Sequence, residues 1–359
     1  MSGILLSLAA AVLGAGGAFG LYRRARQQRN ARALSIDPAA GIDESRFVSV
    51  GGIEQWISIR GAKRDNPVLL VLHGGPATSY MSFTPMFRAW EEHFTVVQWD
   101  RRGVGKTFGR NGSRGSGELT LERIASDGCA VAEYLCKYLH QDKVFLLGHS
   151  MGSMIGITMA ARRPDVFHAY IGTEQVIEMS SNERLSYDMI LARARSVPEE
   201  RTVRQLERLG PPPYRNPRQW GIKQQAAEKV DVAYGRIVSG MMGMMLYSPA
   251  YAIRDLFNLL AGAHFCIQKL YTQWMTFDAR KLGMVFHTPI FIKGDSDVMT
   301  PTALAATWLA EIEAPQKALV SIEEGGHLVF VTAAATYLAE LLTRIRPLAV
   351  VSSGTQCSV

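Results

Sequence analysis

The run Gly148-His149-Ser150-Met151-Gly152 constrains the fold of this chain more than any other stretch of its sequence. The apolar segment VFLLG precedes it and a helical pattern follows, so Ser150 falls on the turn between a buried strand and a helix. Gly148 and Gly152 flank this turn, where any side chain would collide with the neighbouring backbone. The helix N-terminus behind Ser150 favours developing negative charge. The pattern therefore predicts a nucleophilic serine at the edge of a sheet.

Apolar runs that alternate with helical patterns predict an α/β fold with a mostly parallel central sheet and helices on both faces. The expected strands are PVLLVL, FTVVQW, KVFLLG, HAYIG, TPIFIKG and KALVSI. The expected helices span residues 80–94, 119–140, 151–163, 302–312 and 332–344. Two alternating segments, RFVSV and IEQWISIR, flank Gly51-Gly52 and predict a β-hairpin ahead of the first buried strand.

The strand–helix alternation stops after Gly172 and resumes near residue 283. The residues between are amphipathic and contain no buried-strand run, which predicts a helical cap inserted into one α/β domain. The expected organisation is an apolar anchor (1–22), a basic and polar linker (23–45), the first part of the core (46–173), the cap (174–282), the second part of the core (283–348) and a C-terminal tail (349–359).

The N-terminal segment from Gly3 to Tyr22 carries no charge and is followed by five arginines before the first acidic residue, Asp37. Twenty apolar residues are long enough to span a bilayer, and basic residues stay on the cytoplasmic side. We therefore expect an uncleaved membrane anchor with a cytoplasmic catalytic domain. The alternative is a signal segment, cleaved to release a secreted or periplasmic protein.

Composition argues against several classes of partner. Five of the charges behind the net charge of +7 lie in the N-terminal arginine cluster, and no basic stripe with interleaved aromatics follows, so a nucleic-acid partner is not expected. The four cysteines lack metal-ligand spacing, and no metal or organic cofactor is expected.

A serine nucleophile needs a histidine base and an orienting carboxylate, which follow it in the order acid, then histidine, in this type of fold. His327 follows the last expected strand and is preceded by two glycines. Asp297 is the preferred acid because three residues beyond Gly294 leave room for the chain to turn back, and Asp295 is the alternative.

The backbone amides of Met151 and Gly75 are the expected donors to an oxyanion, since one follows the nucleophile and the other follows an earlier strand. His73, Asp100 and Arg102 are expected to support the site from behind, the last two as an ion pair.

The segment Asp100–Thr107, DRRGVGKT, resembles half of a phosphate-binding loop. Asp100, however, stands where such a loop needs a glycine, so a nucleotide is not expected. We therefore interpret the segment as support for the oxyanion loop, with Lys106 on the surface.

Together these residues resemble the prolyl aminopeptidase group of α/β hydrolases. The matching motifs, in order, are HGGPA, DRRGVGKT, GHSMG, GDSD and GGH, spread from about Arg46 to Pro347. The resemblance implies a triad of Ser150, Asp297 and His327, oxyanion donors at Gly75 and Met151, and a cap over the pocket. Four positions depart from the group's pattern: Ala77, Arg101, His149 and Met151. The last two flank Ser150 and make the serine turn closer to that of general esterases.

We therefore expect a serine hydrolase that forms an acyl-enzyme with a small ester, amide or peptide substrate. Release of N-terminal proline is the alternative, and a non-catalytic scaffold is a further one. The insertion is rich in methionine and aromatic residues that suit either an apolar acyl pocket or the insertion's own core: Met241, Met242, Met244, Met245, Trp220, Trp274 and Phe277.

Overall fold

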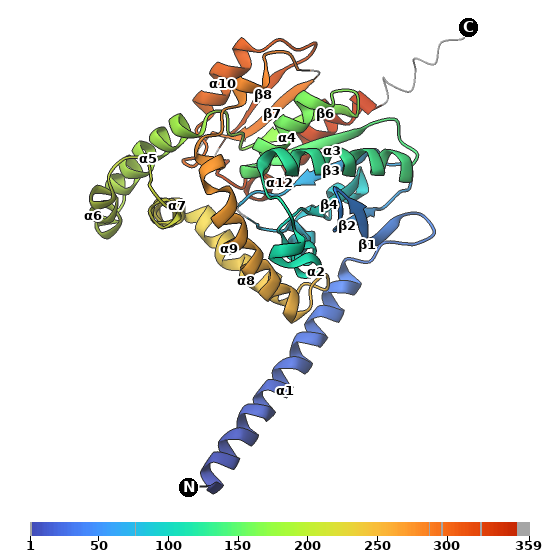
Figure 1. Ribbon diagram of the computed structural model, residues 1–359, viewed down its shortest axis with the longest axis vertical. Coiled ribbons are helices and arrows are strands. Elements are labelled where there is room, and N and C mark those ends of the chain that lie inside the picture. Colours follow the sequence, from blue (N-terminus) through green and yellow to red (C-terminus); the bar gives the residue numbers. More distant parts are fainter. Residues whose placement is uncertain (1, 76, 287, 296, 324, 350–359) are drawn as a thin grey trace.

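The computed structural model describes residues 2–75, 77–286, 288–295, 297–323 and 325–349, and their side chains except at 2–15, 289, 292 and 293. An eight-stranded sheet forms its centre (Figure 1), in the order β1-β2-β4-β3-β5-β6-β7-β8. The first two strands pair antiparallel with each other and β2 pairs antiparallel with β4, and every later pairing is parallel. The strands are β1 (Ile42–Val50), β2 (Ile53–Gly61), β3 (Val68–Leu72), β4 (Thr95–Asp100), β5 (Val144–His149), β6 (Phe167–Thr173), β7 (Pro289–Gly294) and β8 (Ala318–Ile322).

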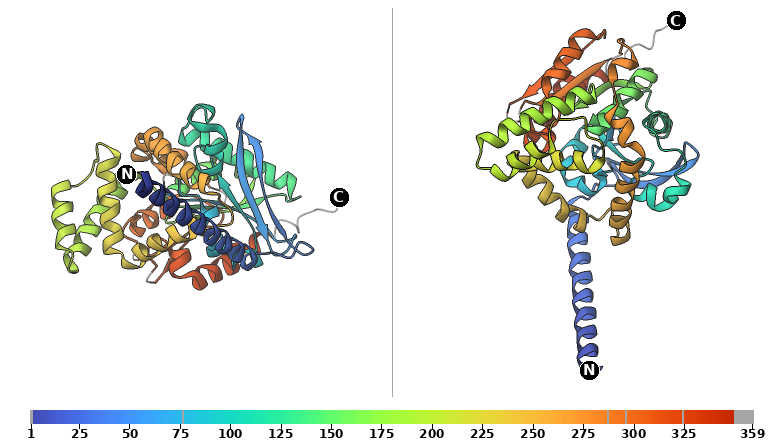
Figure 2. Two further views of the ribbon diagram at one scale, coloured as in Figure 1. Left: turned by 90° about the horizontal axis from the view of Figure 1, so that it is seen from below. Right: turned by 60° about the vertical axis from the view of Figure 1, so that its left-hand side comes forward.

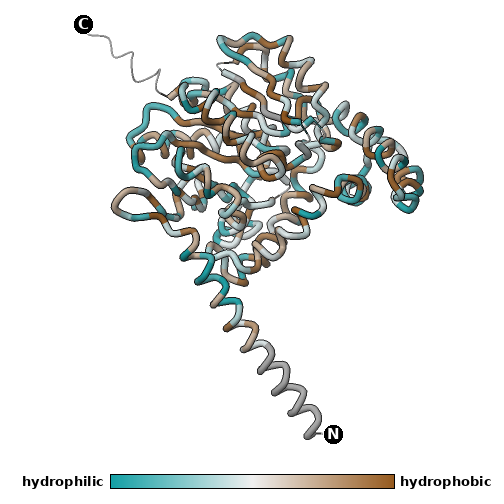
Figure 3. The backbone as a smooth tube through the Cα atoms, turned by 180° about the vertical axis from the view of Figure 1, so that it is seen from behind, coloured by the Kyte–Doolittle hydropathy of each residue, from teal (hydrophilic) through white to brown (hydrophobic). Residues whose placement is uncertain are grey.

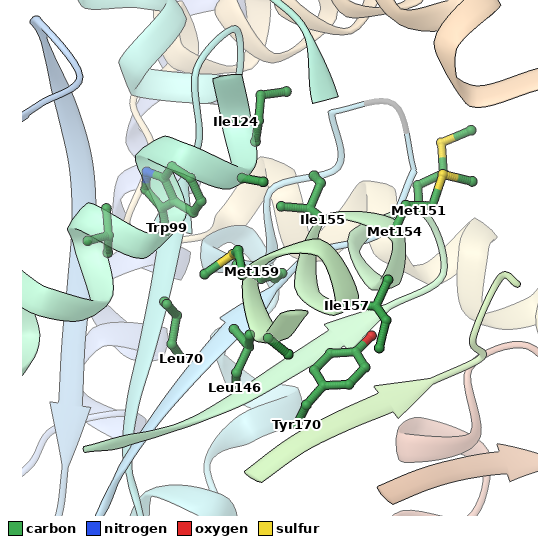
Figure 4. Packing of buried hydrophobic residues seen from close by; sticks show 14 of the residues in the cluster. Leu70, Trp99, Ile124, Leu146, Met151, Met154, Ile155, Ile157, Met159 and Tyr170 are labelled. Carbon is green, nitrogen blue, oxygen red and sulfur yellow. The ribbon is translucent and has the colours of Figure 1, made fainter. Parts of the chain in front are cut away.

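Two hydrophobic cores cover the two faces of the sheet, and neighbouring residues of strands β3 to β7 enter opposite cores. In β3, Leu70 packs with helices α3 (Leu121–Tyr138) and α4 (Met151–Arg162), whereas Leu69 belongs to the other core. Figure 4 shows Leu70 and Leu146 against α4 on the first face. On the second face lie the short helices η1 (Tyr80–Phe87), η2 (Trp90–Glu92), α11 (Val329–Thr332) and α12 (Ala334–Glu340). The hydrophobic strands at the centre of the hydropathy trace (Figure 3) reflect this double burial, and the predicted fold class is confirmed.

Five longer helices lie between β6 and β7 in the chain, and they stand to one side of the sheet in Figure 1. They are α5 (Met179–Ser196), α6 (Glu200–Leu209), α7 (Pro217–Val230), α8 (Val232–Tyr247) and α9 (Ile253–Met275), followed by η3 (Ala279–Leu282). The remaining helices are α2 (Gly105–Gly115), α10 (Thr302–Glu311) and the final turn η4 (Leu341–Ile345).

Three local expectations differ from the structure. The single helix expected over 80–94 is two short 3₁₀ segments, because Pro85 lacks an N–H and Phe83 leaves helical geometry to enter the core. The expected turn after Asp100 continues into α2. The linker expected over 23–45 is helical as far as Ala33 and enters β1 at Ile42.

The N-terminal helix α1 (Ser2–Ala33) projects from the body (Figure 2), and its basic second half is fixed to the corner between α8 and α9. Buried Arg23 donates to the carbonyls of Leu246 (2.9 Å) and Tyr251 (2.8 Å). Gln27 and Asn30, one and two turns later, donate to neighbouring carbonyls of the same corner. These side chains satisfy carbonyls at the end of α8 and in the loop that leads to α9.

Much of the expected anchor (1–22) falls on residues whose side chains lie outside the described set. Within the part of the chain that is described, no helix combines the length and the apolar character needed to cross a bilayer.

Replacing Arg23 with alanine removes its hydrogen bonds to the carbonyls of Leu246 and Tyr251 and leaves the Leu246 carbonyl without this donor, although Gln27 still donates to Tyr251. We expect R23A to lower the free energy of unfolding by about 1–3 kcal/mol. The matched control is R24A, since Arg24 is the exposed neighbour on the same helix. Urea titration of both variants measures the difference, and equal stability of R23A and R24A would contradict docking of α1 through Arg23.

Candidate active site

Ser150 sits on a strained turn between β5 and α4. Its backbone has φ 51° and ψ −123°, a conformation that is unfavourable for any residue with a side chain. Its amide donates to the Thr173 carbonyl (3.0 Å), which ties the turn to the end of β6. A Cβ on Gly152 would lie 2.4 Å from the Leu72 oxygen, and one on Gly148 would lie 2.8 Å from the Gly152 oxygen. Both glycines are therefore required by backbone contact.

A chain of hydrogen bonds joins Ser150, His327 and Asp297. The Ser150 hydroxyl donates to His327 Nε2 (3.0 Å), and His327 Nδ1–H donates to Asp297 Oδ2 (3.2 Å). All three residues come from loops at the carboxyl ends of the parallel strands β5, β7 and β8. The structure thus brings the predicted nucleophile, base and acid into the geometry of a proton relay.

Asp297 is held by several donors, and Asp295 is not part of the relay. The Asp297 Oδ1 atom accepts hydrogen bonds from the amides of Met299 (2.7 Å) and Thr300 (3.1 Å), and the Thr300 hydroxyl donates to Oδ2. These bonds favour the ionised carboxylate that an orienting acid needs. The alternative acid, Asp295, is exposed to solvent.

The loop after β3, residues 73–75, lies beside the nucleophile and is called the glycine loop below. A Cβ on Gly74 would approach the Ser150 Cβ to 3.1 Å, so this loop and the serine turn are in direct contact. Gly75 has φ 61°, in the left-handed region that glycine tolerates. Gly75, Ser150 and Met151 line the same cavity, as the expected oxyanion assignment requires.

Tyr80 and His149 connect the glycine loop to His327, a link the sequence alone did not reveal. The Gly74 amide donates to the Tyr80 hydroxyl (3.3 Å), which donates in turn to His149 Nδ1 (2.5 Å). On its other side, His149 Nε2–H donates to the His327 carbonyl (2.9 Å). Because carbonyl oxygens only accept, this chain fixes the His149 tautomer.

His73 supports the glycine loop as a neutral ring. Its Nδ1–H donates to the Gly74 carbonyl (2.9 Å), and burial together with the charge of Arg101 holds its pKa well below the usual value. Its other nitrogen, Nε2, has no hydrogen-bond partner within the described part of the protein.

Asp100 and Arg102 do not pair with each other, so that prediction was wrong. Asp100 accepts hydrogen bonds from the Tyr251 hydroxyl (2.8 Å) and the Lys106 amide (2.8 Å). Arg102 turns the other way and pairs with buried Asp127 (2.7 Å). Both arrangements join segments far apart in the chain, which a local motif does not encode.

Lys106 was expected on the surface but is half-buried. Its ammonium lies 4.3 Å from the centre of the Trp56 ring and 5.5 Å from that of Tyr251. Burial lowers its pKa. The segment that resembled a phosphate-binding loop therefore packs its lysine against aromatic rings.

Known proteins support the same architecture. Residues 67–209 match the model of a family described as the alpha/beta hydrolase fold. The probable aminopeptidase YbaC of Bacillus subtilis is 29% identical over 78% of this chain and 89% of the relative. The chain therefore has the α/β-hydrolase fold.

Two solved structures share the fold of this α/β hydrolase. A proline iminopeptidase-related protein from Thermus thermophilus superposes with a TM-score of 0.57 at 18% identity, covering 86% of this chain and 99% of that one. A thermophilic esterase from Thermogutta terrifontis gives a TM-score of 0.54 at 17% identity, covering 85% and 99%. Identities this low show only a common fold.

A cavity of about 340 Å³ lies between the sheet edge of this α/β hydrolase and its helical insertion. Ser150 and His327 line it together with residues of α5, α7 and α8. The apolar side chains that line it include Met151, Met154, Val176, Met179, Val238, Met241, Met299 and Leu328.

Of the residues expected in either an acyl pocket or the core of the insertion, Met241 and Trp220 line the cavity. Trp274 is buried in the main core, and Met242 is exposed.

Glu174 is a further residue of the site that motif analysis missed. It follows β6 directly, is fully buried and has φ 51°. An oxygen of Glu174, an oxygen of Asp297 and a nitrogen of His327 lie within 4.8 Å of one another, a spacing that suits a cation as well as a proton relay. The signal available in the sequence was its position at the end of a central parallel strand, where polar residues of such folds gather.

The raised pKa of Asp100 predicts how the free energy of unfolding depends on pH. Burial raises its pKa from 3.8 to about 6, although hydrogen bonds from Ser79, Lys106 and Tyr251 oppose the rise. Because the folded pKa is above the unfolded one, protonated Asp100 stabilises the fold fully below about pH 4, and this advantage disappears as pH rises through 6. The stability of the wild type relative to D100N should therefore fall by about 2 kcal/mol from pH 4 to pH 7. Urea unfolding at a series of pH values measures it, and a constant difference would refute the shift.

Proposed function

We propose that this α/β hydrolase is a serine acyl hydrolase that cleaves small esters or amides through a covalent acyl-enzyme. The observation that carries the proposal is the continuous hydrogen-bond chain from Ser150 through His327 to Asp297, which opens into the cavity. A serine hydroxyl is a weak nucleophile near neutral pH unless a base is aligned with it. The relay supplies that base, and the strained turn presents the hydroxyl to the cavity.

In the acylation step, Ser150 Oγ attacks the substrate carbonyl carbon while His327 Nε2 takes the hydroxyl proton. The resulting oxyanion accepts hydrogen bonds from the amides of Met151 and Gly75. Asp297 keeps Nδ1 protonated and stabilises the imidazolium. When the tetrahedral intermediate collapses, the carbon–oxygen or carbon–nitrogen bond breaks and His327 returns its proton to the leaving alcohol or amine.

In the deacylation step, a water molecule takes the place of the leaving group. His327 removes one of its protons, and the hydroxide attacks the acyl carbon of the ester on Ser150. Collapse of the second intermediate gives a carboxylic acid and returns the proton to Ser150.

The cavity favours a substrate with an apolar acyl group of modest size. Five methionine side chains line the cavity, and unbranched thioethers adapt to irregular apolar groups. A volume of about 340 Å³ is at the lower end for small-molecule sites, which favours short to medium acyl chains over long ones.

The first test measures labelling by a fluorophosphonate probe and ester hydrolysis in the wild type and in two variants. We expect a fluorophosphonate probe to label the wild type but not S150A, and S150A to lose about 10⁴-fold or more of p-nitrophenyl ester hydrolysis. D297N should lose about 10³-fold or more, because the imidazole then has the wrong tautomer. A folded wild-type protein that stays unlabelled would instead support a non-catalytic scaffold.

A second candidate, removal of an N-terminal residue as in prolyl aminopeptidases, is favoured by Glu228. This half-buried carboxyl group lines the cavity, and its pKa is raised by burial. Among the described residues it has no ion-pair partner, whereas Glu183 in the same wall pairs with Lys223 (2.8 Å). A substrate ammonium group beside Glu228 would stabilise both charges. The similarity to the probable aminopeptidase YbaC supports the same candidate.

Proline β-naphthylamide and p-nitrophenyl esters separate the two candidates. If an ammonium group binds at Glu228, E228Q should lower kcat/KM for the naphthylamide at least about 10-fold more than for the ester, since a charge-assisted contact is worth about 1.5–3 kcal/mol. Cleavage of esters alone by the wild type would remove the aminopeptidase candidate. The matched control is E207Q, because Glu207 is an exposed carboxylate of the insertion outside the cavity lining.

A further inference from the structure

Arg101 is a buried cation attached to the glycine loop. It follows Asp100 at the end of β4 and is 2% exposed. Its Nη1 donates to the His73 carbonyl (2.8 Å) and its Nη2 to the Gly75 carbonyl (3.3 Å). One guanidinium therefore spans the loop that lies against Ser150.

These two bonds bracket the peptide unit that carries the Gly75 N–H. That N–H belongs to the planar unit between Gly74 and Gly75, and Arg101 holds the carbonyls of the units immediately before and after it. Because each peptide unit is rigid, holding both neighbours limits the rotation of the one between them. Glycine has no side chain to restrict it, so the loop depends on such external bonds for a single conformation.

The placement is costly for the fold. No carboxylate in the described part of the chain lies within ion-pair distance of Arg101, and burial lowers its pKa to about 10. The adjacent Arg102 is equally buried but has Asp127 as a direct partner. A buried charge without a counter-ion is unfavourable, and charges arranged in this way concentrate at functional sites.

We propose that Arg101 is a positioning residue of the oxyanion site. It holds the glycine loop so that the Gly75 N–H points at the oxyanion formed on the substrate, and its positive charge favours that negative charge in a poorly hydrated environment. The inference rests on the proposed serine hydrolase function, because it assumes attack by Ser150 on a carbonyl.

The test compares R101Q and R101K with the wild type. R101Q removes the charge and the two-pronged bond, whereas R101K keeps the charge but cannot bridge both carbonyls. We expect kcat for a p-nitrophenyl ester to fall on the order of 10–100-fold in R101Q and less in R101K, with KM changed less than about threefold, because a misplaced donor costs less than an absent one.

Inhibition by a boronic acid distinguishes a role at the oxyanion site from a purely structural role, which would leave the inhibition constant unchanged. The boron atom of this acid forms a tetrahedral adduct with Ser150 that carries a negative charge resembling that of the oxyanion. Its inhibition constant should rise in R101Q by about the same factor as kcat/KM falls. The control is R60Q, since Arg60 is a mostly buried arginine paired with Glu91 and level with Val96, at the opposite end of β4. R60Q should lower the melting temperature while kcat and boronic acid binding stay within about twofold.

Two outcomes would overturn the inference: a folded R101Q with kcat within threefold of the wild type, or boronic acid binding unchanged while kcat falls. Circular dichroism at the assay temperature establishes that each variant is folded. If instead the wild type resists fluorophosphonate labelling and cleaves no ester, the proposed function fails, whatever the Arg101 variants do.

Discussion

The backbone contact between the start of α4 and the end of β3 is the constraint on which the rest of the site depends. The α carbon of Gly152 lies so close to the carbonyls of Leu72 and His73 that no side chain fits between them. This contact places Ser150 beside the glycine loop and leaves it in strained geometry. The hydrogen bond from the Ser150 amide to the Thr173 carbonyl holds the strained turn to the sheet. Strain of this kind persists only where the surrounding structure over-determines it.

The parallel sheet brings the other residues of the site to Ser150. Strands β3, β5, β6, β7 and β8 all end at one edge, so the polar residues that follow them converge although they are far apart in the chain. His327 reaches Ser150 because Gly294 and Gly325 allow their two loops to touch, and a Cβ on Gly294 would overlap the Gly325 carbonyl. The insertion adds the opposite wall. Tyr234, from α8, packs edge-on against the His327 ring and limits the directions from which water reaches it.

The sequence was most informative where a local pattern implies a unique geometry. The motif around Ser150 predicts a tight turn from strand to helix, and the loop length after Gly294 favoured Asp297 over Asp295. In the structure Asp297 is the aspartate that His327 contacts. The sequence was least informative about pairs joined across long stretches of chain. Asp127 is 25 residues from Arg102, and Tyr251 is 151 residues from Asp100. Nothing in either motif marks these partners, because burial and pairing are properties of the assembled tertiary structure. Glu174 was missed for the same reason, since it lacks a motif of its own.

The long-range contacts that sequence reasoning missed form one connected support. Arg23 of α1 donates to the Tyr251 carbonyl, and the Tyr251 hydroxyl donates to Asp100. Asp100 is joined through the backbone to Arg101, which holds the glycine loop against Ser150. Each link is buried, so each bond is stronger than it would be in water and more costly to leave unmade. A chain of hydrogen bonds and backbone links therefore connects the N-terminal helix, the corner between α8 and α9 and the glycine loop. The segments that it joins are separated by more than 200 positions in the sequence.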